Sequence, residues 1–184
     1  AGMGYVSVLH AEFPDWTATD LRGPQLKNDD YDVRDFVKMQ ELGATLIRKG
    51  VYWNGTEKVK GEYDFSVFDS IVTNADSRGI WVVATMAFGN KLHEDTLMPK
   101  VNDPDTLVSP RGIVTEAGRQ GYAAWGAALA EHFKGKKILF EIWNEPNVRT
   151  FWGWHGDHNS RQFAQEYTAL VKETVPAMKA ADPD

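Results

Sequence analysis

The sequence of 184 residues contains no cysteine, so it can form neither a disulfide framework nor a thiolate metal site. This absence leaves the redox compartment open, and both secretion and a cytoplasmic location are compatible with it. No apolar run approaches the roughly 20 residues that a helix needs to cross a bilayer, so no membrane partner is expected. The net charge is −6 and no basic run occurs, which argues against nucleic acid as a partner.

Four apolar segments have the composition of strands buried on both faces of a parallel sheet, and a helical pattern follows each of them. These segments comprise residues 5–9, 44–48, 80–87 and 138–143. In the helical patterns, apolar residues recur three and four positions apart, over residues 33–42, 67–75, 122–133 and 163–178. Glycines follow three of the patterns, as expected where helices end, at positions 43, 79 and 135. The chain, residues 1–184, is therefore predicted to be a single α/β domain.

The connections between these elements are unequal in length. Those from strand to helix are long and comprise residues 10–31, 49–64, 88–114 and 144–159, whereas those from helix to strand are short. Long loops at the carboxyl ends of parallel strands carry the active site in (β/α)8 barrels. The competing architecture, an open doubly wound sheet, places a glycine-rich turn after the first strand, but this sequence has LHAEFPDW there. We therefore predict a (β/α)4 arrangement of parallel strands, which is half of a TIM barrel.

One glutamate, Glu141, lies within the fourth predicted strand. Side chains alternate along a strand, so Phe140 and Ile142 can pack against the outer helices while Glu141 points into the sheet interior. A carboxylate in that position needs a partner, and Arg48 at the end of the second strand is a candidate. Glu141 is therefore interpreted as a structural residue.

A second glutamate, Glu145, lies at the end of the same strand, where Pro146 stops the hydrogen-bonding ladder. Its side chain is expected at the top of the sheet, partly withdrawn from water by Trp143 and Trp152. A carboxyl group in such surroundings is suited to act as a general acid. Glu145 is therefore the candidate for chemistry.

Two other groups of polar residues are interpreted as loop residues. His93, Glu94 and Asp95 fall in the long third loop and are expected to be solvated. His155 and His158 have the H-x-x-H spacing that can supply two metal ligands, but no third ligand is apparent. The sequence therefore predicts neither a metal site nor a cofactor.

The motifs around these residues resemble a known group of enzymes. FEIWNEPN, followed by FWGW and a helix with the sequence YTALVKETVPAMKAADP, resembles the fourth strand and helix of clan A glycoside hydrolases, most closely family 39. The segments LGATLIRKGVYWNGTEKVKGEYDFSVFD and RGIWVVATMAFGN resemble the second and third units of that clan. Family 39 includes β-xylosidases, α-iduronidases and bacterial exopolysaccharide hydrolases. The resemblance covers nearly the whole chain and corresponds to the N-terminal half of the barrel.

The resemblance implies a (β/α)8 barrel that hydrolyses O-glycosidic bonds in carbohydrates with retention of configuration. It identifies Glu145 as the acid/base, which protonates the glycosidic oxygen and later activates water. A second glutamate, at the end of strand seven, would attack the anomeric carbon. Asn144 would form a hydrogen bond with the 2-hydroxyl group of the sugar. The remaining substrate-binding positions that the resemblance and the loop placement imply are Arg48, His10, Trp53, Asn90 and Trp152.

The sequence contains only the first four of the eight expected strand–helix units, so the strand that would carry the nucleophile is missing. Glu166 and Glu173 lie in the last predicted helix and cannot replace it. We therefore expect the chain alone to be a weak or inactive glycosidase. The outer strands lack the Lys and Pro residues that protect sheet edges, so we expect a homodimer or a complex with the C-terminal half-barrel. The alternative is a non-catalytic carbohydrate-binding or self-assembling half-barrel scaffold, truncated or engineered.

Overall fold

A parallel sheet lies at the centre of the computed structural model, which describes residues 17, 20–100, 103–108, 112–152 and 161–183. The strand order is β1-β2-β3-β6, and each neighbouring pair is parallel. These strands are β1 (Gln25–Leu26), β2 (Leu46–Tyr52), β3 (Trp81–Ala87) and β6 (Ile138–Ile142). The predicted α/β class with parallel strands is confirmed. The first predicted strand, residues 5–9, lies outside the described residues, and the two-residue β1 pairs with β2.

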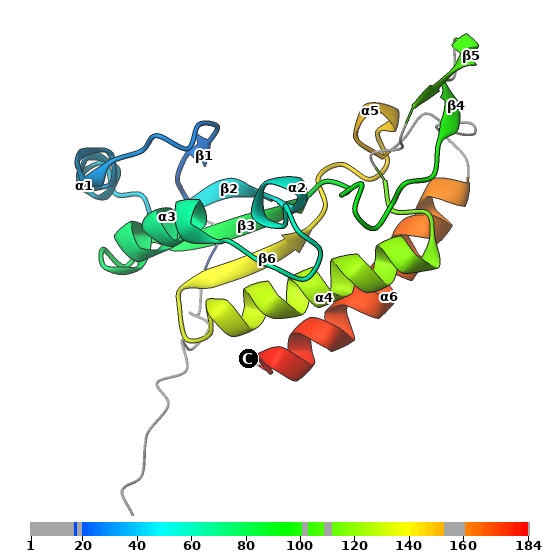
Figure 1. Ribbon diagram of the computed structural model, residues 1–184. Helices are drawn as coiled ribbons and strands as arrows, with labels where there is room; N and C mark the ends of the chain where they lie inside the picture. The colour runs from blue at the N-terminus through cyan, green and yellow to red at the C-terminus, as the bar shows by residue number, and fades with distance from the viewer. Residues whose placement is uncertain (1–16, 18–19, 101–102, 109–111, 153–160, 184) are drawn as a thin grey trace, which may run out of the picture.

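Helices and one small hairpin complete the described fold. The four longer helices are α1 (Val33–Glu41), α3 (Ser66–Asp76), α4 (Glu116–His132) and α6 (Arg161–Ala181). The short helices α2 (Trp53–Thr56) and α5 (Arg149–Trp152) follow β2 and β6. An antiparallel hairpin, β4 (Met98–Lys100) and β5 (Asp103–Val108), occupies part of the segment that we predicted as a loop. Figure 1 shows α4 and α6 side by side along one face of the sheet, with α1 and α5 at opposite ends of the molecule.

The two faces of the sheet differ in burial because side chains alternate along each strand. The outward residues of β2 and β3 are almost completely buried under the helices: Ile47, Lys49, Val51, Val82, Ala84 and Met86. Each large apolar side chain buried in this way contributes about 1.5–3 kcal/mol. Lys49 is the charged exception, and its Nζ lies 2.6 Å from the carboxylate of Asp29. On the inner face of β2, Leu46, Arg48 and Gly50 stay half-exposed.

Capping residues mark the ends of several helices. Asp32 begins α1 and accepts a hydrogen bond from the backbone of Arg34. The Arg34 guanidinium also bonds to this carboxylate and holds the pKa of Asp32 below its ordinary value. Thr115 begins α4, where its hydroxyl accepts a hydrogen bond from the Gly118 backbone. The three predicted C-terminal glycines have the positive φ that such positions require, at 75° for Gly43, 71° for Gly79 and 76° for Gly135.

One strand boundary differs from the prediction in a way that matters for the site. The second strand was predicted to end at Arg48, but β2 continues to Tyr52. Its register with β3 is unbroken, from the pair Leu46–Trp81 to the pair Tyr52–Ala87. The ladder to a central strand outweighs the weak strand preference of Gly50, because each added pair satisfies backbone groups that would otherwise be unpaired.

Candidate active site

An arginine connects the strands at the centre of the inner face. Arg48 on β2 donates from Nε to the Glu141 carboxylate on β6 over 2.8 Å, which confirms the predicted pair. Thr85 on β3 donates to the same carboxylate oxygen over 2.6 Å. The second arm of Arg48, through Nη2, donates to Oδ1 of Asn144 over 2.9 Å. Glu141 is therefore held by neighbouring strands, and Asn144 is held by the same arginine.

The backbone beyond β6 has an unusual conformation. Trp143 has a φ of 70° and Glu145 a φ of 49°, values that residues other than glycine rarely adopt. Each such residue costs about 1–3 kcal/mol and persists only where its surroundings fix it. Here the Trp143 amide donates to the carbonyl of Met86 over 3.0 Å, and its indole donates to the carbonyl of Phe151 over 3.2 Å. Strain of this kind commonly accompanies functional sites.

Two tyrosines from the outer helices support the strand ends beneath this turn. Tyr122 of α4 donates to the carbonyl of Met86 over 2.7 Å, and Tyr167 of α6 donates to the carbonyl of Ile142 over 2.9 Å. Burial raises the pKa of Tyr122 well above its ordinary value and also raises that of Tyr167. Both phenols therefore keep their protons near neutral pH and remain donors, so α4 and α6 fix the ends of β3 and β6.

Glu145 extends from this turn into solvent. Its side chain is exposed and its carbonyl accepts a hydrogen bond from Val148 over 2.9 Å, at the start of the turn into α5. We expected Trp143 and Trp152 to shield it, but both indoles are buried, at 1% and 0% exposure. The strand alternation on which that expectation rested ends at Ile142, and the left-handed backbone directs Trp143 into the core.

Comparison with known proteins identifies the family of this chain. Residues 17–184 match the family described as cellulase, glycosyl hydrolase family 5. The chain belongs to this glycosyl hydrolase family. It is also similar to a β-xylosidase of Geobacillus stearothermophilus, with 30% identity over 138 residues; the match covers 68% of this chain and 24% of the β-xylosidase.

Solved structures show the same fold. A family 39 glycoside hydrolase from the gut symbiont Bacteroides cellulosilyticus WH2 matches 87% of this chain and 29% of its own length, with a TM-score of 0.63 and 23% identity. The endoglucanase Cel5A of Thermotoga maritima matches 89% of this chain and 48% of its own, with a TM-score of 0.60 and 19% identity. The resemblance to clan A glycoside hydrolases is confirmed, and the chain corresponds to part of their barrel.

In this glycosyl hydrolase chain, the predicted substrate-binding tryptophans lie in the core. Trp53 has no exposed surface and stacks on both His93 and Trp125, at centroid distances of 4.9 and 5.8 Å. Trp53 directly follows β2 and begins α2, and its side chain packs in the same core cluster as Ile47 and Val51. Trp152 is equally buried and donates from its indole to Glu166 over 2.7 Å. A side chain without exposed surface cannot stack on a sugar, so both have structural roles in this arrangement.

Asn90 also differs from its expected place on the pocket wall. It is 4% exposed, and its amide donates to the backbone carbonyl of Glu57 over 2.9 Å. The Glu57 carboxylate is buried and accepts from the Trp53 indole, the Gly61 amide and the His93 ring. This network joins the loop after β2 to the loop after β3. His10, the remaining predicted position, lies outside the described residues and stays a prediction.

Part of the third loop is buried rather than solvated as we expected. The His93 side chain is only 8% exposed because its ring pairs with Glu57. Glu94 is 2% exposed, and its Oε2 accepts hydrogen bonds from the amides of Val114 and Thr115 and from the Thr115 hydroxyl. Polar residues that cap a distant helix cannot be distinguished from solvated ones by composition alone. Asp95 is exposed, as expected.

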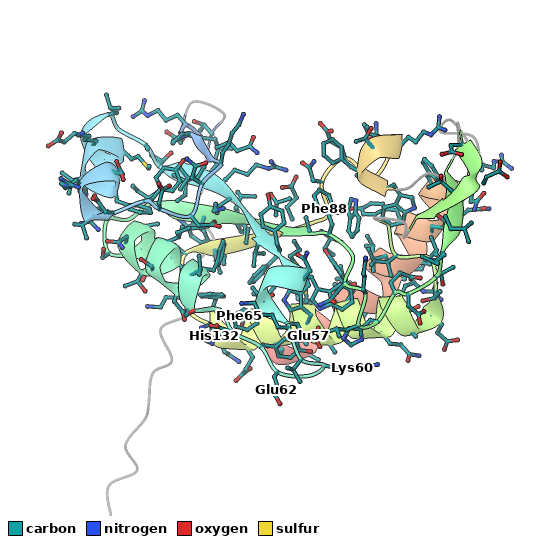
Figure 2. All side chains as sticks on the ribbon, turned by 45° about the horizontal axis from the view of Figure 1, so that its top comes forward. Glu57, Lys60, Glu62, Phe65, Phe88 and His132 are labelled. Atoms are coloured by element: carbon teal, nitrogen blue, oxygen red, sulfur yellow. The ribbon has the colours of Figure 1, made fainter. Side chains whose placement is uncertain are left out.

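Three aromatic residues at or beyond the carboxyl ends of the strands were not among the predicted site residues. Tyr52 ends β2, Phe88 follows β3 and Phe151 lies in α5, and we call this group the aromatic strip. Figure 2 shows Phe88 close to α5, on the opposite side of the sheet from Glu57. Extending the alternation from Arg48 through Gly50 would have placed Tyr52 on the inner face. No sequence signal distinguishes Phe88 and Phe151 from core residues.

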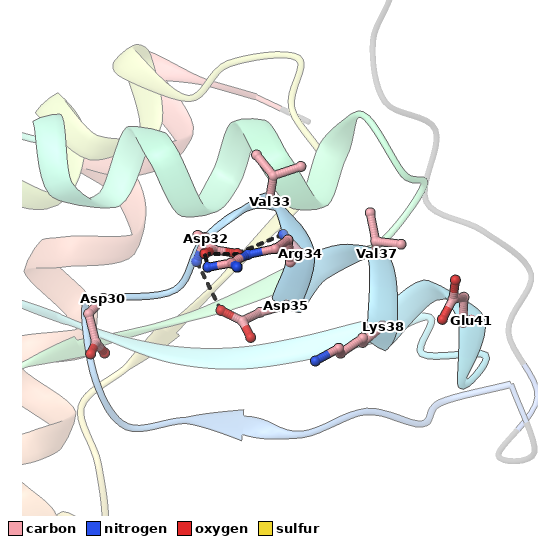
Figure 3. Close-up of a pocket in the computed structure, with 8 residues that line it drawn as sticks. All are labelled: Asp30, Asp32, Val33, Arg34, Asp35, Val37, Lys38 and Glu41. Carbon is pink, nitrogen blue, oxygen red and sulfur yellow. Dashed lines mark hydrogen bonds and ion pairs between the residues drawn. The ribbon is translucent and has the colours of Figure 1, made fainter.

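Other features of the described residues lie away from this site. A surface depression at α1 is lined by Asp30, Asp32, Val33, Arg34, Asp35, Val37, Lys38 and Glu41 (Figure 3). Because α1 and α5 are at opposite ends of the molecule, this depression is separate from Glu145 (Figure 1). No group of three or more metal-ligating side chains occurs in the described part of the chain. Within the same residues, no helix combines the length and apolar character of a membrane span.

Proposed function

We propose that this chain supplies the proton-transfer half of a retaining glycosidase site, with Glu145 as the acid/base. The exposed Glu145 carboxyl follows a strained turn at the carboxyl ends of the strands, where (β/α)8 enzymes carry their catalytic groups. It would protonate the glycosidic oxygen as the bond breaks and would then remove a proton from the attacking water. The match of the chain to a cellulase family and its similarity to a β-xylosidase support a carbohydrate substrate.

The observation that carries the proposal is the fixed position of Asn144. Its amide oxygen accepts from Arg48 over 2.9 Å, so its NH2 group is left to donate to a ligand. A donor next to the acid/base can bind the 2-hydroxyl group of the sugar, an interaction that strengthens in the transition state. Arg48 in turn is fixed by Glu141. The arginine therefore acts as a positioning residue for the substrate contact.

The nucleophile in this proposal comes from outside the described residues. Retaining enzymes place their two carboxyl groups about 5–5.5 Å apart. Glu141 does not suit the role, because Arg48 and Thr85 both bind its Oε2. We propose that strand seven of a complete barrel supplies the second carboxylate, or that a second copy of the chain supplies a poorer substitute. The chain alone is then a weak or inactive glycosidase.

The hydrolysis of aryl glycosides tests the role of Glu145. We expect slow turnover by the chain, which Glu145→Gln reduces by at least 100-fold, in keeping with the usual contribution of a general acid. The loss should be larger for poor leaving groups than for dinitrophenolate, because a good leaving group needs no proton. Glu131→Gln, on the exposed face of α4, is the matched control. Equal turnover by both variants would refute the assignment.

A second candidate function is carbohydrate binding without turnover. It is favoured by the engagement of Glu141 in the arginine network, which leaves Glu145 without a second available carboxylate on the inner face of the described strands. Saturable sugar binding with no measurable hydrolysis, even at high protein concentration, would support this function. Turnover that depends on Glu145 would exclude it.

A further inference from the structure

We propose that Glu166 is a positioning residue for the acid/base: through the buried indole of Trp152, it fixes the left-handed turn that presents Glu145. The inference rests on the proposed function, because the position of this carboxyl matters to catalysis only if the carboxyl transfers a proton. It concerns a carboxylate on α6, one of the two helices that lie along one face of the sheet (Figure 1).

The turn that carries Glu145 is closed by tryptophans at its two ends. The rings of Trp143 and Trp152 meet edge-on with centroids 5.0 Å apart, and the Trp143 indole donates to the carbonyl of Phe151 over 3.2 Å. Between these ends, the Val148 amide donates to the carbonyl of Glu145 and the Trp152 amide donates to the carbonyl of Val148, each over 2.9 Å. A displacement of Trp152 is therefore passed to Glu145 through two backbone hydrogen bonds.

The far end of this turn is attached to α6 by Glu166. Its Oε2 accepts a hydrogen bond from Nε1 of Trp152 over 2.7 Å, and its Oε1 accepts from the side-chain amide of Gln162 on the same helix over 2.9 Å. Trp152 has no exposed surface, so its indole N–H depends on an acceptor inside the protein. Without that acceptor the buried donor would have to move toward water, and α5 would move with it.

Two further contacts hold Trp152 in place. Gly112, just before α4, donates from its amide to the Trp152 carbonyl and lies so close that a β-carbon there would be 2.7 Å from the ring. Tyr167 follows Glu166 on α6, and its ring meets that of Trp152 edge-on at 6.0 Å. Its hydroxyl also donates to the carbonyl of Ile142 at the end of β6. Trp152 is thus the point at which α6, the segment before α4 and the turn meet.

The backbone of the turn explains why such an attachment is needed. Trp143 and Glu145 both have positive φ, and a strained backbone persists only where its surroundings fix it. The Glu145 side chain is exposed, and its carboxyl accepts no hydrogen bond from the described residues, so the backbone of the turn sets its direction. Reacting groups have to be held within about 0.5 Å of their productive position by the residues behind them. Glu166 is such a supporting residue.

A purely structural role for Glu166 predicts a different result from a positioning role. The loss of a contact that only stabilises the fold lowers the fraction of folded chain, so the hydrolysis of every substrate falls by the same factor. The loss of a positioning contact impairs proton donation, so hydrolysis falls only where the leaving group needs a proton. The ratio of kcat/KM for phenyl and dinitrophenyl glycosides separates the two roles, because dinitrophenolate leaves without protonation.

The experiment measures kcat/KM of the 184-residue chain on phenyl and dinitrophenyl β-xylosides and β-cellobiosides. We expect Glu166→Leu to reduce hydrolysis of the phenyl glycosides about 10- to 100-fold and that of the dinitrophenyl glycosides less than about threefold, because a misplaced general acid loses much of its contribution. Glu166→Gln should stay within about threefold of the wild type on both, since its amide oxygen can still accept from Trp152. Glu173→Leu is the matched control. It removes a carboxylate of the same helix that pairs with Arg119 of α4 over 2.5 Å, and it should change both rates by equal factors.

Trp152→Phe tests the same hydrogen bond from its other end, and it decides the question if Glu166→Leu does not fold. It keeps an aromatic ring against Trp143 but removes the donor, so it should show the same selective loss. The double variant Glu166→Leu/Trp152→Phe should lose no more than either single variant, as expected for two residues that act through one contact. Thermal melting of each variant checks that the fold persists.

Nuclear magnetic resonance follows the geometry of the turn without turnover. The backbone amide signals of Asn144 and Glu145 should move in Glu166→Leu and stay in place in Glu173→Leu. Unmoved signals in Glu166→Leu, or equal losses for both leaving groups, would overturn the positioning role. If Glu145→Gln nevertheless shows the selective loss, the proposed function stands while this inference fails. If Glu145→Gln hydrolyses phenyl glycosides as fast as the wild type, or the wild-type chain shows no turnover, the proposed function fails and the positioning role fails with it.

Discussion

The role of a single residue in the sheet depends on which face its side chain takes, because side chains alternate along each strand. Arg48 and Tyr52 share the inner face of β2, whereas Lys49 and Val51 belong to the outer series and are buried. The same rule makes Glu141 a structural residue although it is a carboxylate close to the site, because it faces Arg48 on a neighbouring strand. The rule ends with the strand, so it does not place Trp143 or Glu145, which have left-handed backbones.

Glu57 is the residue whose loss should weaken the fold most among the polar groups of the loops. Its buried carboxylate accepts from the Trp53 indole, the Gly61 amide and the His93 ring. Glu57→Gln puts an NH2 group opposite at least one of these donors, and a buried donor without an acceptor costs several kcal/mol. We expect a loss of about 2–4 kcal/mol in the free energy of unfolding, measured by urea denaturation.

The control for this substitution is Glu62→Gln, at an exposed position of the same loop. It should change the free energy of unfolding by less than about 0.5 kcal/mol, as surface substitutions usually do. Similar urea midpoints for the two variants would mean that the Glu57 network contributes no more than a solvated loop.

At the scale of elements, helix caps connect the loops to the helices that cover the sheet. Thr115 begins α4, and its hydroxyl both accepts from the Gly118 amide over 3.0 Å and donates to buried Glu94 over 2.8 Å. Thr115→Ala removes both contacts, and we expect it to lower the free energy of unfolding by about 1–2 kcal/mol. Thr73→Ala on the exposed side of α3 is the control and should have little effect. Thermal unfolding of both variants would show equal midpoints if the cap were unimportant.

The elements were predictable where local chemistry alone specifies them. Apolar spacing and C-terminal glycines located the four longer helices, and continuous apolar runs located β3 and β6. The end of β2 was missed because the ladder to β3, a tertiary interaction, extends it across Gly50. The hairpin of β4 and β5 was missed because its segment has no alternating pattern and was assigned to a loop. The motif around Glu145 indicated the glycoside hydrolase resemblance, which is confirmed, whereas the grouping of the aromatic strip depends on which strand ends become neighbours.

At the scale of the whole molecule, the two faces of the sheet are covered to different extents among the described residues. The helices bury the outward residues of β2 and β3, whereas the inner face is only partly covered: Trp81 and Thr85 are buried there, but Leu46, Val83 and Leu139 remain half-buried. β6 pairs only with β3 in the described sheet, so its other edge presents unpaired backbone groups. An apolar face beside an unpaired edge favours association with another chain. A closed barrel removes both features, because its strands pair all the way round and their inner side chains pack against each other.

We therefore predict that the chain self-associates at micromolar concentration, and that Leu139→Lys shifts it toward the monomer. The lysine places a charge on the inner face of the edge strand, where another apolar surface would have to desolvate it, and inward-pointing charges are a natural protection of sheet edges. Light scattering coupled to size-exclusion chromatography measures the mass of each variant across a dilution series. Gln165→Lys, which adds the same charge on the exposed side of α6, should leave the association unchanged. A folded, monodisperse monomer of the wild-type chain over the whole series would show that the inner face and the β6 edge need no partner.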